Sequence, residues 1–151
     1  MKQYLLSTVF ILTVILCFAH EKTVTSYIFH SVTVVDTKSS SVKETLATRG
    51  MIIIGQYDNL KYIVVSMSPD RTKDLVFRVL QTNKEQVKNY TFETYKCCAV
   101  DSIEGNNILG SGIIMLEYDS DKNPDVPYEI WYQINGEDVL LIYGGIIKVD
   151  A

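Results

Sequence analysis

VPYEIWYQINGEDVLLIYGGIIKV, residues 126–149, is the stretch that decides the fold. Two runs of apolar, aromatic and β-branched residues flank Asn135-Gly136, the dipeptide that best tolerates the positive φ angles of a two-residue type I′ turn. In the first run the face of Ile130 alternates with the face of Trp131, which is the period of a strand with one buried side. The stretch therefore predicts a β-hairpin whose Ile130 face is buried in a core that the rest of the chain supplies.

Similar short runs recur along the chain, with turn residues between them. They predict further strands over residues 23–35, 42–48, 51–54, 60–65, 74–81, 90–100 and 109–118. The run 74–81 also fits helical spacing, but it is short and β-branched, and residues 82–88 favour a loop or one helical turn. Parallel strands need crossover helices that this pattern lacks. The predicted fold is all-β, an antiparallel β-barrel or β-sandwich of about eight to ten short strands with little helix.

The size and strand spacing resemble the general layout of small barrels of the lipocalin family. The Gly-x-Trp signature of that family's first strand is missing, and Trp131 lies near the other end of the chain. The resemblance therefore implies a lipocalin-like layout and no particular ligand.

The N-terminus has the pattern of a secretory signal peptide. Lys2 precedes an apolar run over residues 5–18, and Cys17 and Ala19 supply the small residues of a cleavage site. This predicts a signal peptide over residues 1–19, a single all-β domain over residues 20–151, and a secreted protein, extracellular or periplasmic. A membrane anchor or a lipid on Cys17 is the alternative, but the run is shorter than the ~20 residues of a membrane span, and no later segment is long and apolar enough.

Composition narrows the classes of partner. The net charge of −4 and the absence of a basic run argue against a nucleic-acid partner.

Cys97 and Cys98 are adjacent, so in a strand their side chains point to opposite faces. Three states stay open for these thiols: reduced and shielded, joined in a strained ring, or paired with another chain.

Residues for catalysis and metal binding are few. Outside the predicted signal peptide the histidines are His20 and His30, which makes a nucleophilic site hard to build. Oxygen side chains alternate in one loop, as in the first half of a calcium-binding loop. These residues are Asp119, Asp121, Asn123 and Asp125. Pro124 replaces the turn glycine of an EF-hand and Ile130 replaces its last glutamate, so a plain polar loop is the alternative to a weak structural calcium site, and no other cofactor is predicted.

Aromatic density in the last hairpin supplies candidate binding residues, although it also suits sheet packing. The candidates are Glu129, Trp131, Gln133 and Tyr143. We expect a secreted, non-catalytic binding or interaction module, which holds either a small apolar ligand inside a barrel or a protein partner on an aromatic sheet face. The alternatives are a glycan hydrolase that uses strand carboxylates such as Glu93, Glu117 and Glu129, and a structural, envelope-associated accessory protein.

Overall fold

The computed structural model describes residues 24–67 and 74–149. The predicted signal peptide, and with it the predicted start of the mature domain, lies outside the described residues. Within them the chain forms no helix and nine β-strands. The strands are β1 (Thr25–Asp36), β2 (Ser41–Tyr57), β3 (Leu60–Met67), β4 (Leu75–Val87), β5 (Tyr90–Val100), β6 (Ile108–Asp119), β7 (Glu129–Ile134), β8 (Val139–Gly144) and β9 (Ile147–Val149).

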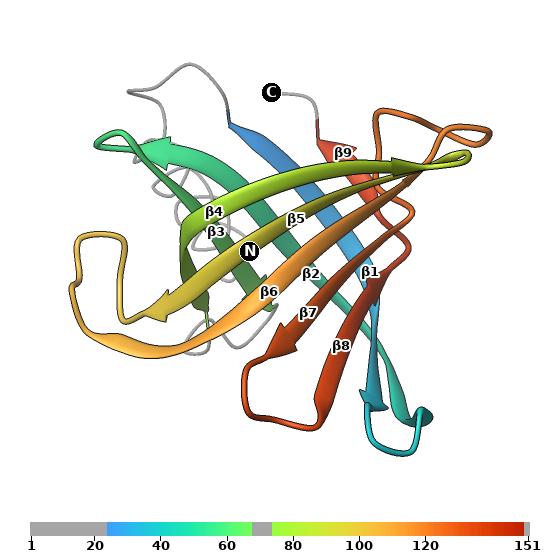
Figure 1. Ribbon diagram of the computed structural model, residues 1–151, viewed down its shortest axis with the longest axis horizontal. Coiled ribbons are helices and arrows are strands. Elements are labelled where there is room, and N and C mark those ends of the chain that lie inside the picture. Colours follow the sequence, from blue (N-terminus) through green and yellow to red (C-terminus); the bar gives the residue numbers. More distant parts are fainter. Residues whose placement is uncertain (1–23, 68–73, 150–151) are drawn as a thin grey trace, which may run out of the picture.

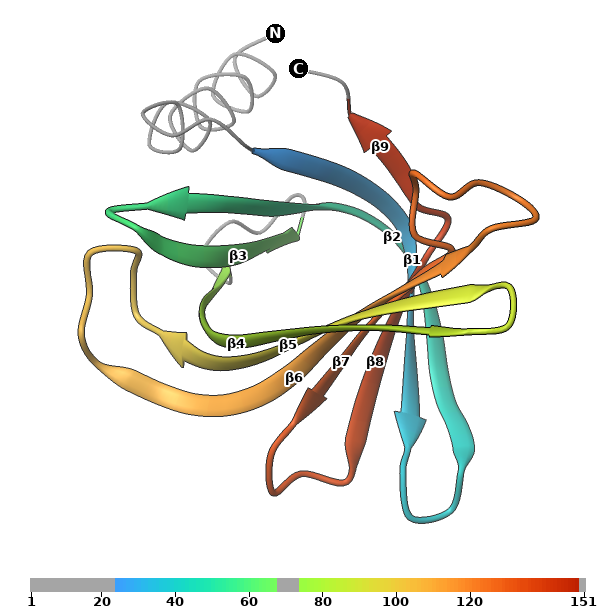
Figure 2. The ribbon, with the colours of Figure 1, turned by 45° about the horizontal axis from the view of Figure 1, so that its top comes forward.

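The strands form a closed antiparallel barrel of eight strands with one extra strand. Their order is β2-β3-β4-β5-β6-β7-β8-β1-β9, and β1 also pairs with β2, which closes the ring. Figures 1 and 2 show the curved wall of β4 to β8 facing β2 and β3, with the β1–β2 and β4–β5 hairpins extending beyond the barrel in different directions. The predicted all-β, antiparallel fold is confirmed. Of the two predicted forms, barrel and sandwich, the structure has the barrel.

Two strands are longer than predicted. Residues 42–48 and 51–54 belong to one strand of 17 residues, β2. Gly50 lies inside this strand and does not end it. A glycine is needed there because an added Cβ would meet the Phe29 ring at 2.3 Å and the Ser66 carbonyl oxygen at 2.4 Å, so its lack of a side chain allows close packing.

The predicted loop or helical turn over residues 82–88 is also wrong. Most of this segment belongs to β4, which continues to Val87 in a ladder with β5 that includes the pair Lys84 and Glu93. Pairing with a neighbouring strand outweighs the low strand propensity of its polar residues.

The turns differ from the expected pattern in one place. Asp58 and Asn59 both have positive φ, 49° and 62°, and join β2 to β3 as a two-residue turn of the primed type. In the β7–β8 hairpin only Gly136 has a positive φ, 82°, and the strands resume at Val139. The predicted two-residue type I′ turn at Asn135-Gly136 is therefore wrong, because the connection spans the four residues 135–138.

The barrel interior is filled by side chains from alternate positions of every long strand. Phe29 packs against Tyr143 with ring centroids 4.9 Å apart, and Phe77 packs against Tyr132 at 4.8 Å. Gly112 leaves space for this core, since an added Cβ would lie 2.8 Å from the Tyr132 ring. The fully buried side chains of this core include Phe29, Ile52, Ile63, Phe77, Tyr95, Ile114, Leu116 and Ile130.

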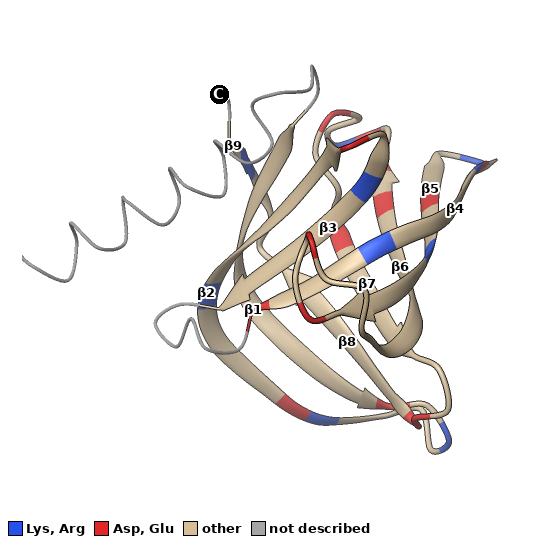
Figure 3. Ribbon diagram, turned by 90° about the vertical axis from the view of Figure 1, so that its left-hand side faces the viewer, with Lys and Arg blue, Asp and Glu red and all other residues tan. Residues whose placement is uncertain are grey.

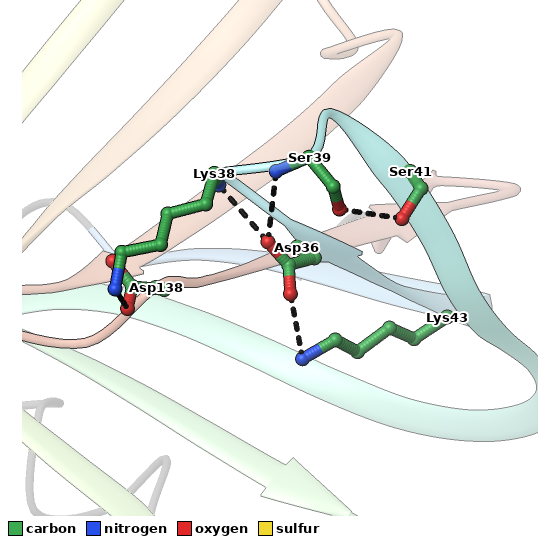
Figure 4. Close-up of polar contacts among 6 residues, drawn as sticks. All are labelled: Asp36, Lys38, Ser39, Ser41, Lys43 and Asp138. Atoms are coloured by element: carbon green, nitrogen blue, oxygen red, sulfur yellow. Dashed lines mark hydrogen bonds and ion pairs between the residues drawn. The ribbon is translucent and has the colours of Figure 1, made fainter.

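A polar cluster fixes the β1–β2 turn (Figure 4). The Asp36 carboxylate accepts hydrogen bonds from the backbone N–H groups of Lys38 and Ser39, both at 3.0 Å, and pairs with the Lys43 ammonium at 2.9 Å. These donors lower the pKa of Asp36 to about 2, with the Ser39 backbone N–H contributing most. Lys38 pairs with Asp138, which ties this turn to the β7–β8 connection.

Lys88 offers a test of turn strain, because it lies in the β4–β5 turn with a φ of 55°. A left-handed backbone costs a side chain with a Cβ roughly 1–2 kcal/mol, and β-branched residues suffer most. We expect Lys88→Gly to have a free energy of unfolding about 1–2 kcal/mol above that of Lys88→Val, measured by urea denaturation. The same pair of changes at Lys96, inside β5, should show the reverse order, and equal stabilities at position 88 would contradict the turn geometry.

Asp36 should make stability depend on pH under acidic conditions. Its pKa is lower in the folded chain than in the unfolded chain, so its contribution is complete above the ordinary value of 3.8 and is lost as the pH falls toward about 2. The difference in free energy of unfolding between the native chain and Asp36→Asn should therefore shrink over this range. A difference that stays constant from pH 5 to about 2 would refute the assignment.

Candidate functional site

A hollow of about 290 Å³ opens at the end of the barrel where β1 begins and β2 ends. Figure 1 shows these two strand ends toward its top. We call this hollow the mouth. Its walls come from six strands, β1, β2, β3, β5, β6 and β9. The lining residues are Thr25, Tyr27, Ile54, Gly55, Gln56, Lys61, Glu93, Tyr95, Tyr118 and Lys148.

The polar groups of the mouth converge on one carboxylate. Tyr95 donates its hydroxyl to Glu93 Oε2 at 3.0 Å, and Tyr118 donates to the same oxygen at 3.4 Å. The Tyr27 hydroxyl lies 3.4 Å from that of Tyr118, and Lys61 Nζ donates to the Tyr95 hydroxyl at 3.3 Å. We call these five residues the Glu93 cluster.

The tyrosines of this cluster act as hydrogen-bond donors over the physiological pH range. Burial is the first cause that raises the pKa of Tyr95, and the nearby Glu93 charge raises it further. Burial likewise raises the pKa of Tyr118, followed by its hydrogen bond with Tyr27. Loss of a hydroxyl proton is unfavourable in such surroundings, so the Glu93 carboxylate stays next to neutral phenols.

Strand alternation places these side chains inside the barrel. Glu93 and Tyr95 alternate with outward positions of β5 and share the face of buried Cys97. Lys148 pairs with Tyr27 across β9 and β1, and directly paired residues point to the same face of a sheet. The interior therefore changes from apolar in the middle of the barrel to polar and charged at this end.

Patterns in the sequence did not predict this site. Glu93 was considered only as a strand carboxylate, and Lys61 and Lys148 gave no signal of their own. The one indication in the sequence was that Glu93, Tyr95 and Cys97 alternate and therefore share one face of a strand. Only the strand pairing shows which other residues meet that face, including Lys84, whose Nζ lies 3.7 Å from Glu93 Oε1.

Three of the four predicted binding residues lie together, on the outside of the barrel. Glu129, Trp131 and Gln133 occupy alternate positions of β7, and the Trp131 indole N–H donates to Glu129 Oε2 at 3.0 Å. Tyr143 pairs with Ile130 and is buried in the core. Its grouping with the other three is corrected, because the register of β8 turns it to the opposite face.

Carboxylates also face each other on this outer surface. Glu117 and Glu129 are directly paired across β6 and β7, and burial, followed by the Glu129 charge, raises the pKa of Glu117. Glu93 lies on the inner face, so the three carboxylates proposed for glycan hydrolysis do not share one site. Docking of a partner on the Trp131 face stays a prediction.

The acidic loop uses its oxygens for its own hydrogen bonds. The Asp119 carboxylate accepts the Asp121 N–H at 3.0 Å and pairs with Lys122 at 3.4 Å. Asp121 accepts the Asn89 amide at 2.6 Å, and the Asn123 side chain accepts the Asp125 N–H at 3.0 Å. The described part of the chain holds no cluster of three or more His, Cys, Asp or Glu side chains with metal-binding geometry, and the predicted calcium site has no further support.

The two cysteines lie on opposite sides of the barrel wall, as predicted. Cys97 points into the core, whereas Cys98 packs in a second apolar cluster that contains Tyr62 and Val64. Both are free and buried. Burial raises the pKa of the Cys97 thiol to about 12, so it carries little thiolate near neutral pH.

His30 has a local structural contact. Its Nδ1 lies 2.9 Å from the Gly145 carbonyl oxygen, at the point where β8 gives way to β9. This contact fits the interpretation of His30 as an ordinary strand residue.

Comparison with known proteins gives no relative: no protein-family model, no curated protein and no solved structure matches the chain. Among the residues that the structure describes, no helix is long and apolar enough to cross a membrane. Any function must therefore be argued from the geometry of the chain itself.

The buried thiols lead to a test with a thiol reagent. In the native protein, Cys97 and Cys98 should react with dithionitrobenzoate far more slowly than a small free thiol, and both should react at once in strong denaturant. Mass spectrometry of the modified protein would identify the residues. Fast labelling of either cysteine under native conditions, without loss of β-sheet circular dichroism, would contradict the burial described above.

Proposed function

We propose that this chain is a secreted, non-catalytic binding protein that holds a small ligand in the mouth of its barrel. The observation that carries the proposal is the hollow of about 290 Å³, which is lined by three tyrosines, one glutamate and two lysines. Small-molecule sites are usually concave and combine apolar walls with a few placed polar groups. Secretion rests on the apolar N-terminal run of the sequence.

The ligand of this proposal differs from the fully apolar one expected first. The middle of the barrel is occupied by side chains such as Phe29, Phe77 and Leu116, which are fully buried. The space lies nearer the end, where Tyr27 and Ile54 offer apolar surface beside the polar groups. A ligand with a compact apolar body and at least one polar group fits these walls.

The arrangement of carboxylates favours binding over glycan hydrolysis. Retaining and inverting glycosidases place two carboxyl groups about 5–10 Å apart across the same sugar. Here Glu93 is in the mouth, whereas Glu117 and Glu129 lie on the outer surface. The Glu93 carboxylate also accepts two tyrosine hydroxyls, an arrangement suited to holding groups in place.

A blocking substitution tests whether the mouth binds ligands. Two dyes serve as probes, anilinonaphthalene sulfonate and the uncharged N-phenylnaphthylamine, which both brighten in apolar surroundings. We expect at least one of them to bind, and Thr25→Trp to reduce that binding by roughly tenfold or more, because the indole would fill space beside Tyr27.

The matched control is Thr33→Trp, on the same strand. The Thr33 hydroxyl lies 3.2 Å from that of Thr45 outside the mouth, so this change should leave dye binding intact. Circular dichroism would confirm that both variants fold. The proposal fails if neither dye binds, or if Thr25→Trp and Thr33→Trp have the same effect.

A further inference from the structure

The charges that face into the mouth have the opposite balance to the whole chain. The chain carries 18 acidic and 14 basic residues, and Figure 3 marks the positions of those that the structure describes. At inward-facing strand positions around the mouth, the described residues include three lysines and a single acid, Glu93. The lysines are Lys61, Lys84 and Lys148.

Glu93 already has partners within the chain. It accepts the hydroxyls of Tyr95 and Tyr118 and lies 3.7 Å from the Lys84 ammonium. Lys84 is largely exposed at the rim and is not part of the lining. Two lysines that line the hollow, Lys61 and Lys148, are left without a carboxylate partner among the described ion pairs.

Lys61 is held in place by groups that do not cancel its charge. Its Nζ donates to the neutral Tyr95 hydroxyl at 3.3 Å and lies 4.5 Å from the centre of the Tyr95 ring. A cation over an aromatic face keeps its charge and loses side-chain freedom. This ammonium is therefore positioned at the wall of the hollow with donor capacity left for a ligand.

We propose that the ligand of the mouth is a small organic anion, with its acidic group between Lys61 and Lys148 and its apolar body against Tyr27 and Ile54. This inference rests on the proposed function and names the chemical class of its ligand. The acidic group is a carboxylate, sulfonate or phosphate ester, since each accepts charge-assisted hydrogen bonds from ammonium groups. The hydroxyls of Tyr95 and Tyr118 hold the Glu93 carboxylate in place by donating hydrogen bonds to it. These hydrogen bonds reduce the electrostatic repulsion between Glu93 and an anionic ligand.

The two dyes separate an anionic ligand from a neutral one, because they share an anilinonaphthalene body and differ in the sulfonate. We expect the sulfonate dye to bind at least about tenfold more tightly than its uncharged partner. Lys61→Met and Lys148→Met should each weaken the sulfonate dye by roughly tenfold and leave the uncharged dye unchanged. Added salt should weaken only the sulfonate dye.

Two further variants sharpen the test. Glu93→Gln removes the one acid that faces the mouth among the described residues and should tighten binding of the sulfonate dye. Lys96→Met, an outward and exposed position on β5 that pairs with Ile113, is the matched control and should have no effect. If Lys61→Met lowers stability, Lys61→Arg keeps the charge and should keep binding of the sulfonate dye within a few-fold of the native value.

The outcomes distinguish the two proposals. Equal binding of both dyes, blocked by Thr25→Trp and insensitive to the lysine variants, would overturn the anionic class and leave the binding function standing. Binding of the sulfonate dye that Lys96→Met weakens as much as Lys61→Met does would also overturn it, as a nonspecific charge effect. If neither dye responds to Thr25→Trp, the binding function itself fails.

Discussion

The pairing of β1 is the constraint on which the rest of the barrel depends. One edge of β1 pairs with β2 along almost its whole length, and the other edge is shared by β8 and β9. Without it, β2 to β8 would form an open sheet with two exposed edges. Closure decides which side chains become interior, and it tolerates two irregularities in the β1–β2 ladder, between Phe29 and Ser31 and between Val34 and Val35. At the first of these, His30 contacts Gly145, where β8 gives way to β9.

Closure also makes the polar groups of the mouth costly, because it turns them toward the inside of the barrel. An inward charge in a barrel costs free energy unless it finds partners. The chain satisfies Glu93 with two phenols and a lysine, and satisfies Lys61 with Tyr95. Apolar residues at these positions would extend the core already formed by Phe29 and Ile52. The cluster departs from the apolar packing of the core, as proteins often do at functional sites, and this departure supports the binding role proposed above.

Local patterns in the sequence predict the strands well and the site poorly, for a physical reason. Alternation assigns Ile130 to the core and Trp131 to the outer face, since both lie on one strand. Tyr143 was misplaced because no local pattern showed how β8 pairs with β7, and in the observed register Tyr143 lies opposite Ile130 and so faces the core. The segment around Lys84 looked like a loop because its partner strand supplies the stabilisation that its own composition lacks.

The mouth required a further kind of information. Lys61, Glu93 and Lys148 come from β3, β5 and β9, and each is an ordinary charged residue within its own strand. Only the register of several ladders shows that all three face the same space. Sequence periodicity can assign a residue to one of two faces, but it cannot say which faces of distant strands meet.

An acidic protein can still bind an anion at such a site, because distance and solvent weigh the charges unequally. At physiological ionic strength the screening length is about 8 Å, so carboxylates on the outer surface, such as the Glu117 and Glu129 pair, act weakly on a ligand held behind the barrel wall. Lys61 and Lys148 line the hollow itself, so their charges would act on a bound anion at shorter range and with less screening. For the anion proposed above, the local balance of charge would therefore govern affinity, and the overall negative charge would mainly affect solubility and the rate of approach.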